Sequence, residues 1–185
     1  MASVLVPLAA GCEELEAVTI IDLLRRAGIE VVTAGLEDGP VRCSRGTRLI
    51  PDVTLDEVAG REFDMIVLPG GQPGADHLRE DPRIRKVLTG LAESDSYIAA
   101  ICAAPRVLAA AGLLDNRNAT SFPGALDGLD IRGLVYRDDA VVRDGKIITS
   151  RGPGTAMEFA LTLIELLLGK AKRGEVEGPL QRPAR

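Results

Sequence analysis

One cysteine of this chain lies where a nucleophile is expected. Residues 97–101 form a short apolar run that predicts a buried strand, and the alanine-rich residues 103–111 predict a helix with Pro105 in its first turn. Cys102 therefore falls on the turn between strand and helix, where a nucleophile elbow holds its serine. The N–H groups of a helix start would favour an exposed thiolate there. From this stretch alone a buried, inert cysteine is an equally good interpretation.

Two glycines could supply main-chain groups to this cysteine. Gly70 and Gly71 follow an apolar run at residues 65–68, and glycine lets main-chain N–H groups approach an oxyanion closely. Together with the N–H group of Ala103, they predict an oxyanion hole. The alternative is that the two glycines only form a tight turn.

A carboxyl group could also serve the cysteine. Glu16 lies near the start of a helix predicted over residues 13–27. Beside a thiolate, like charge and burial would raise its pKa, so that it could donate a hydrogen bond or act as acid and base. The alternative is a solvated first-turn glutamate that complements the helix dipole, and the residues alone favour it.

Strands and helices alternate along the chain. Apolar runs predict strands, and apolar residues at helical spacing predict helices. The strands are predicted at residues 3–8, 29–34, 65–68, 97–101 and 119–122, and as a hairpin at 141–149. The helices are predicted at 13–27, 103–111 and 155–168, and a helical region interrupted at Pro82 follows Gly71. Residues 35–52 interrupt the alternation and predict a small antiparallel ribbon from 41–43 and 48–50. This order predicts an α/β fold with a mostly parallel sheet and helices on both faces.

The topology predicts where a ligand binds. In parallel sheets the site lies outside the carboxyl ends of the strands, near a topological switch point. The loop at residues 10–16, the glycines at 70 and 71, and Cys102 each follow a predicted strand. We therefore expect these three segments to meet at one edge of the sheet.

Composition narrows the class of protein. The 185 residues, 46% of them hydrophobic, predict one domain over residues 1–169 and a loosely docked tail over 170–185. The net charge of −5 and the 3% aromatic content disfavour nucleic-acid binding, and the basic residues of the tail are interrupted by glutamates. Three cysteines are no disulfide framework and favour the reducing cytoplasm. No apolar run is long enough for a membrane span, and we expect no metal and no cofactor.

Four segments carry a family resemblance: Glu13-Glu14-Leu15-Glu16, Leu68-Pro69-Gly70-Gly71, residues 99–105 around Cys102, and residues 149–155. In this order and over nearly the whole chain, they resemble the ThiJ/PfpI superfamily, most closely its branch of parkinsonism-associated deglycase-like proteins. The resemblance implies a flavodoxin-like sandwich, a homodimer, and a reactive, easily oxidised Cys102 beside a protonated Glu16. It also implies oxyanion contacts from Gly71 and Ala103. Arg45 matches an arginine that approaches the site of the other subunit, and Cys43 matches an interface cysteine.

One position departs from the family pattern. Phe122 stands where many members have a histidine near the nucleophile. The only histidine of the chain, His77, follows Gly71 by six residues and is expected on the surface. A cysteine–histidine–glutamate triad is therefore not expected, which argues against protease, amidase or amidotransferase activity, because these need a base for the nucleophile and a proton for the amine.

Two hypotheses for function remain. In the first, Cys102 adds to a 2-oxoaldehyde such as methylglyoxal, and Glu16 relays protons until water releases a 2-hydroxy acid without glutathione; deglycation is related chemistry. In the second, Cys102 is a redox sensor or chaperone switch that peroxide oxidises to a sulfinate, with little or no turnover. Cys12 could resolve a sulfenic acid on Cys102 as a disulfide, although a small residue that fills the loop is the favoured interpretation.

Overall fold

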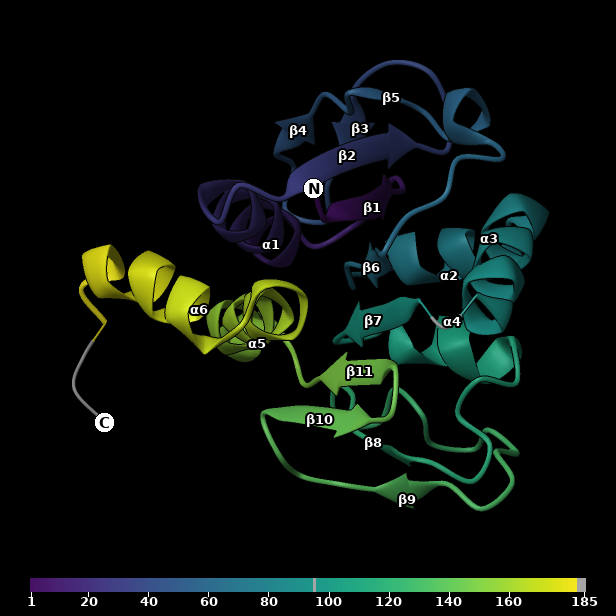
Figure 1. Ribbon diagram of the computed structural model, residues 1–185. Helices are drawn as coiled ribbons and strands as arrows, with labels where there is room; N and C mark the ends of the chain where they lie inside the picture. Colours follow the sequence, from purple (N-terminus) through teal and green to yellow (C-terminus); the bar gives the residue numbers. More distant parts are fainter. Residues whose placement is uncertain (95, 183–185) are drawn as a thin grey trace.

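A seven-stranded sheet forms the centre of the protein, which is described by a computed structural model over residues 1–94 and 96–182 (Figure 1). Every strand pair in this sheet is parallel except β10–β11, which is an antiparallel hairpin. The strand order is β10 (Val141–Asp144), β11 (Ile147–Ser150), β7 (Tyr97–Ile101), β6 (Met65–Leu68), β1 (Ser3–Leu8), β2 (Glu30–Gly35) and β5 (Val53–Thr54). The predicted strands of this sheet are confirmed to within a residue or two.

Helices cover both faces of the sheet, as the alternation predicts (Figure 1). On one side lie α1 (Glu14–Arg26), α5 (Ala156–Leu168) and α6 (Lys170–Glu177); on the other lie α2 (Gly74–Glu80), α3 (Pro82–Glu93) and α4 (Pro105–Ala110). Alternate strand residues point to the two sides. In β6, Met65 and Val67 join the core beneath α1 and α5, whereas Ile66 and Leu68 join the core beneath α3 and α4. The fold is the expected flavodoxin-like α/β sandwich.

A two-stranded antiparallel ribbon lies outside the main sheet. It pairs β3 (Val41–Arg42) with β4 (Arg48–Leu49), which confirms the ribbon predicted within residues 35–52. A second pair, β8 (Asn118–Ala119) with β9 (Val135–Tyr136), is parallel, and β9 was not predicted. Among the described residues there are also three short 3₁₀ helices: η1 (Asp56–Val58), η2 (Pro153–Thr155) and η3 (Gly178–Leu180).

Local signals set the helix boundaries. The side chain of Glu13 accepts a hydrogen bond from the N–H of Leu15 and caps α1, and Asp81 caps α3 in the same way with Pro82 in its first turn. The helix predicted over 103–111 is shorter than expected. Cys102 has a left-handed backbone, the next residues form a turn, and α4 begins only at Pro105.

The C-terminal segment forms a further helix with several ion pairs. Beyond Gly169 the chain forms α6, and its Val176 is buried. The guanidinium of Arg173 pairs with Glu158 at 2.6 Å and with Glu165 at 3.2 Å, and Arg182 also pairs with Glu158, at 3.1 Å. Residues 183–185 of the predicted tail lie outside the described residues. The division into a domain of 1–169 and a tail stays a prediction.

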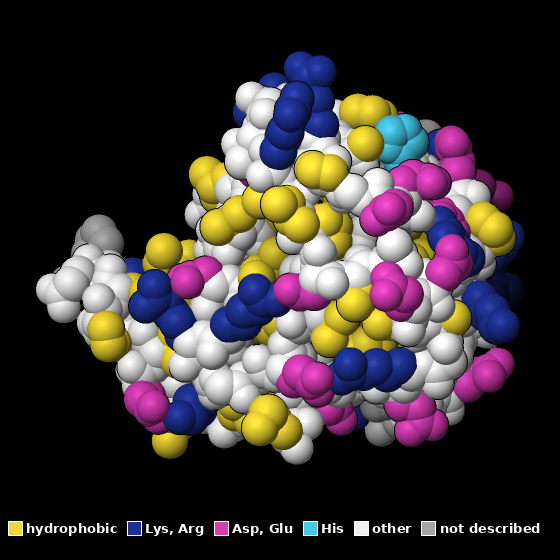
Figure 2. Space-filling model, turned by 90° about the horizontal axis from the view of Figure 1, so that it is seen from above, with side chains coloured by type: hydrophobic (Ala, Val, Ile, Leu, Met, Phe, Trp, Pro, Cys, Tyr) yellow, Lys and Arg dark blue, Asp and Glu magenta, His cyan; other side chains and the backbone are white. Residues whose placement is uncertain are grey.

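Surface charge is mixed. On the face shown in Figure 2, Lys and Arg side chains lie among Asp and Glu side chains, with hydrophobic side chains between them. Among the described residues, no helix is both long enough and apolar enough to cross a membrane.

Candidate active site

The predicted site segments meet at one edge of the sheet. β11, β7, β6 and β1 are neighbours in that order and run parallel, so their carboxyl ends lie side by side. The chain goes from β1 to β2 on one side and returns to β6 on the other, which makes the gap between β1 and β6 a topological switch point. The loops after β1, β6 and β7 carry Glu16, Gly70 and Gly71, and Cys102.

Cys102 occupies a strained turn directly after β7. Its φ of 64° lies in the left-handed region, which non-glycine residues seldom adopt. Two main-chain hydrogen bonds hold it: its N–H donates to the carbonyl of Ser150 at 2.9 Å, and its carbonyl accepts from the N–H of Phe122 at 2.8 Å. The predicted turn is therefore present. The predicted exposure is wrong, since only 9% of the residue is exposed.

Glu16 is fully buried, so the solvated first-turn glutamate favoured by the residues alone is wrong. Its Oε2 accepts a hydrogen bond from the N–H of Gly70 at 2.8 Å. The carboxyl lies beside the Cys102 side chain, close enough to raise the pKa of its thiol. Within the described part of the chain, Oε1 has no hydrogen-bond partner. The carboxyl and the thiol thus form a buried pair.

Gly70 and Gly71 hold the loop after β6 against this pair. A Cβ on Gly70 would lie 2.6 Å from the Cys102 Cβ and 2.8 Å from Glu16 Oε2, so only glycine fits. Gly71 has a φ of 90°, and a Cβ there would overlap the main chain of residues 11–13. The N–H of Gly70 is already bonded to Glu16, which argues against its predicted role as an oxyanion donor.

The main-chain N–H groups of Gly71 and Ala103 lie beside the Cys102 sulfur and act to lower the pKa of its thiol. Burial raises the pKa of the Glu16 carboxyl to about 7, and the hydrogen bond from Gly70 and the neighbouring Cys102 thiol oppose that rise. Burial and the neighbouring Glu16 carboxylate raise the pKa of the Cys102 thiol, so the lowered pKa expected from the sequence is wrong. Because two adjacent negative charges repel, the pair carries at most one negative charge near neutral pH. A thiolate therefore forms only while Glu16 is protonated.

Two further residues border the sulfur. A Cβ placed on Gly152, which follows β11, would lie 3.9 Å from the Cys102 Sγ and 3.3 Å from the Phe122 ring. Phe122 is half exposed, so its ring forms one wall at the mouth of the site. The sequence singled out Phe122 only as a replaced histidine and left Gly152 unassigned. The glycine-rich residues after a predicted strand were the available signal for Gly152.

Four other singled-out residues lie away from the pair. His77 is exposed, as predicted, and its Nδ1 lies 2.9 Å from the carbonyl of Ala10; the single histidine is cyan in Figure 2. Arg45 is exposed, and its main-chain N–H donates to Glu14 at 3.1 Å; its approach to a second subunit stays a prediction. The sulfur of Cys12 lies 3.5 Å from that of Cys43 and makes no described contact with Cys102.

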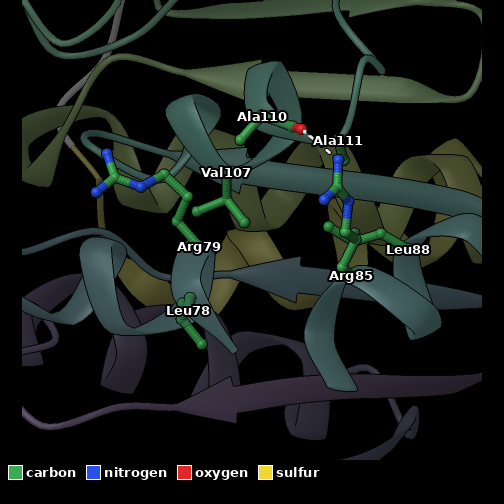
Figure 3. A pocket seen from close by; sticks show the side chains of 7 residues that line it. All are labelled: Leu78, Arg79, Arg85, Leu88, Val107, Ala110 and Ala111. Carbon is green, nitrogen blue, oxygen red and sulfur yellow. Dashed lines mark hydrogen bonds between the residues drawn. The ribbon is translucent and has the colours of Figure 1, made fainter. Parts of the chain in front are cut away.

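Two hollows elsewhere on the protein are not lined by the predicted site residues. Figure 3 shows a crevice of about 50 Å³ between α2, α3 and α4, lined by Leu78, Arg79, Arg85, Leu88, Val107, Ala110 and Ala111, where Arg85 donates to the Ala110 carbonyl. A hollow of about 720 Å³ lies between α3 and the segment from Leu55 to Asp64. Neither includes a predicted site residue. Over residues 1–94 and 96–182, no group of three or more His, Cys, Asp and Glu side chains is placed to hold a metal ion.

Comparison with known proteins places this geometry in context. The model of the DJ-1/PfpI family matches residues 2–166. The chain is 47% identical over 176 residues to Protein dj-1beta of Drosophila melanogaster, covering 94% of each protein. It is 42% identical over 168 residues to the Glutathione-independent glyoxalase DJR-1.2 of Caenorhabditis elegans, covering 91% of this chain and 89% of that protein. The crystal structure of Drosophila melanogaster DJ-1beta superposes with a TM-score of 0.94 at 45% identity and 99% coverage of both chains.

Proposed function

This chain belongs to the DJ-1/PfpI family, and from that premise we propose that it converts 2-oxoaldehydes such as methylglyoxal to 2-hydroxy acids without glutathione. One observation carries the proposal: the carboxyl of Glu16 is buried against the thiol of Cys102 at the carboxyl edge of the sheet. A relative 42% identical to this chain is named a glutathione-independent glyoxalase. Deglycation is related carbonyl chemistry at the same cysteine.

The reaction begins with proton transfer within the pair. The Glu16 carboxylate takes the thiol proton as the Cys102 sulfur attacks the aldehyde carbon and the C=O π bond opens. It then gives that proton to the former aldehyde oxygen, which completes a hemithioacetal with a new C–S bond and leaves Glu16 ionised. The pKa of Glu16, about 7, suits a group that must both accept and return a proton at neutral pH. The N–H groups of Gly71 and Ala103 stabilise negative charge on the sulfur.

Glu16 then moves a proton between the two carbons of the substrate. It removes the proton from the former aldehyde carbon and returns a proton to the neighbouring carbon, so the aldehyde carbon is oxidised to a thioester and the ketone is reduced to an alcohol. Water hydrolyses the thioester, releases the 2-hydroxy acid and frees the thiol. Overall, one 2-oxoaldehyde and one water molecule are converted to one 2-hydroxy acid, and no redox cofactor is consumed.

The side chains beside the sulfur favour this chemistry over amide hydrolysis. Phe122 carries no proton to give a leaving amine, and His77 is bonded to Ala10 on the surface. A thioester needs no such proton, because a thiolate is a good leaving group. In the sensor hypothesis Glu16 only holds the oxidised sulfur, whereas the carbonyl reaction also uses its ability to accept and return a proton.

The experiment is lactate formation from methylglyoxal by purified protein in buffer free of glutathione. We expect the Cys102→Ser and Glu16→Gln variants each to lose activity by at least about 100-fold. Cys43→Ala and Glu30→Gln are the matched controls, because Cys43 contacts Cys12 and Glu30 pairs with Arg61 at 2.7 Å. Activity that persists in both site variants, or wild-type protein that forms no lactate, overturns the proposal.

We further propose that the protein acts as a homodimer in the cytoplasm. Leu15 and Val18 on α1 and Met157 on α5 are 51%, 46% and 37% exposed, more than is usual for large apolar side chains. α1 and α5 pack against each other, so these side chains support a shared interface beside the site. Light scattering coupled to size-exclusion chromatography tests the dimer, and a monomeric mass contradicts it.

A further inference from the structure

Two cysteines that the carbonyl chemistry does not use face each other inside the protein. The Sγ atoms of Cys12 and Cys43 lie 3.5 Å apart, and both thiols are free. Cys12 lies in the loop after β1, and Cys43 directly follows β3 of the ribbon. Both are buried, with 0% and 4% of their surfaces exposed. A bond between them would fasten the ribbon to the loop that enters α1.

The main chain already holds the two segments side by side. The N–H of Gly11 donates to the carbonyl of Arg42 at 2.8 Å, and the N–H of Ser44 donates to the carbonyl of Cys12 at 2.8 Å. These two hydrogen bonds flank the cysteine pair. A disulfide has an S–S distance of about 2.05 Å, so the sulfurs need to approach by about 1.5 Å, which side-chain rotation and a small main-chain shift can supply.

Glutamate side chains fix the turn that follows Cys43. Glu14 accepts hydrogen bonds from the N–H groups of Arg45 at 3.1 Å and Thr47 at 3.3 Å. The hydroxyl of Ser44 donates to Glu13 at 2.9 Å. The turn after Cys43 is therefore already held against the segment that follows Cys12. Forming the disulfide would require little further loss of chain flexibility.

From this geometry we propose that Cys12 and Cys43 form a reversible internal disulfide. With a peroxide as the oxidant, two S–H bonds and the O–O bond break, one S–S bond forms, and the two protons and two electrons of the thiols leave in two water molecules. A small thiol reverses the reaction by exchange. Neither sulfur takes part in the carbonyl reaction, so this is a second redox site apart from Cys102.

Main-chain hydrogen bonds connect the Cys12–Cys43 pair to the candidate active site. The N–H of Glu13, next to Cys12, donates to the carbonyl of Gly70 at 2.9 Å, and the N–H of Gly70 donates to Glu16. The disulfide would therefore join the ribbon covalently to the loop that positions Glu16. Because the closed loop spans residues 12 to 43, the oxidised protein should resist unfolding better than the reduced protein.

The test uses full-length protein with Cys102→Ser, so that the candidate nucleophile cannot compete for the oxidant. The folded protein is treated with hydrogen peroxide or diamide, free thiols are blocked, and the protein is digested with trypsin without reduction. Cleavage after Arg25, Arg42 and Arg45 gives peptides 1–25 and 43–45. We expect these peptides to appear linked, two hydrogen atoms lighter than their sum, and to separate on reduction.

Thermal unfolding provides the second measurement. We expect oxidation to raise the Tm of the Cys102→Ser protein by about 5 °C or more, and the matched Cys12→Ala/Cys102→Ser protein to show no such rise. Urea-unfolded protein, oxidised in the same way, is the positive control for detecting the linked peptide. The proposal is overturned if the linked peptide forms in that control but not in the folded protein, or if a Cys43–Cys43 link between two copies forms instead. Neither readout depends on glyoxalase activity, so failure here is distinct from failure of the proposed function.

Discussion

Gly70 holds Glu16 against the candidate nucleophile from the next strand of the sheet. The N–H of Gly70 donates to Glu16 Oε2 at 2.8 Å, and its carbonyl accepts from the N–H of Glu13 at 2.9 Å. The start of α1 is thus bonded through one residue to the end of β6. Because α1 and β6 flank the topological switch point, this clasp places the carboxyl at the switch point.

Replacing Gly70 by alanine should separate the pair. The added Cβ would lie 2.6 Å from the Cβ of Cys102 and 2.8 Å from Glu16 Oε2, so one of them must move. We expect the glyoxalase kcat/KM to fall by at least about 100-fold, since a displacement of about 1 Å in such a site has an effect of that size. Steady-state kinetics with methylglyoxal measures the loss.

The matched control is Gly90→Ala. Gly90 lies within α3, and a Cβ there meets nothing within 4 Å. Alanine favours a helix over glycine by up to about 1 kcal/mol, so this variant should unfold at a higher urea concentration and keep full activity. A Gly70→Ala protein as active as Gly90→Ala would show that the clasp has no role in positioning Glu16.

The raised pKa of Glu16 predicts how stability depends on pH. The carboxyl titrates near 7 in the folded protein and near 4.5 when unfolded, so between these values the folded state binds the additional proton. Its contribution to stability is therefore fully present below pH 4.5 and is lost as the pH rises through 7. We expect wild type to lose about 3 kcal/mol relative to Glu16→Gln across this window.

Urea unfolding of wild type and Glu16→Gln in parallel, in steps of pH, measures this difference. Groups common to both proteins cancel in the comparison, so the slope between pH 4.5 and 7 reports on Glu16 alone. Two curves that run parallel over that range would mean that the folded carboxyl titrates as an ordinary glutamate and is not protonated near neutral pH.

The sequence located Cys102 and the layered α/β fold because both depend on local patterns. A strand, a cysteine and an alanine-rich helix are contiguous, and the apolar runs of a parallel sheet are visible one strand at a time. The burial of Glu16 could not be read in this way. It depends on Gly70, which lies 54 residues further along the chain and meets Glu16 only when β6 pairs beside β1.

Other features escaped prediction for the same reason. Cys12 and Cys43 come together through ribbon packing, which no periodicity encodes. The attachment of α6 depends on Glu158, whose helix is separate in sequence from Arg173. The lowered pKa expected for Cys102 rested on the helix start alone and left out the opposing effects of burial and the Glu16 carboxylate.

Phe122 should influence which aldehydes the site accepts. Its half-exposed ring and the Cys102 sulfur border the same small space at Gly152, while its side chain holds no proton to transfer. We expect Phe122→Ala to lower kcat/KM for phenylglyoxal by about tenfold and to change methylglyoxal turnover much less, since removed apolar contact matters most for a large apolar substituent. Leu129→Ala, at another partly exposed apolar residue, is the control. Equal losses for both substrates would assign Phe122 a structural role instead.

Arg45 offers a test of whether two subunits share one site. The family resemblance predicts that its guanidinium, which is exposed in the single chain, approaches the site of the other subunit, where it would complement the negative charge of the Cys102–Glu16 pair. Arg45→Ala should therefore lower kcat/KM by about tenfold or more, whereas Arg48→Ala, on the adjacent β4, should not.

Mixing two impaired variants shows which subunit's site Arg45 serves. If Arg45 acts across the interface, a heterodimer of Cys102→Ser and Arg45→Ala has one complete site, built from Cys102 of one subunit and Arg45 of the other. Random exchange of equal amounts should then restore about a quarter of wild-type activity, because half of the dimers are mixed and each holds one good site of two. If Arg45 serves its own subunit, the mixture has only the average activity of the two variants measured separately. Exchange is checked by a size tag on one variant, so that a lack of rescue is informative.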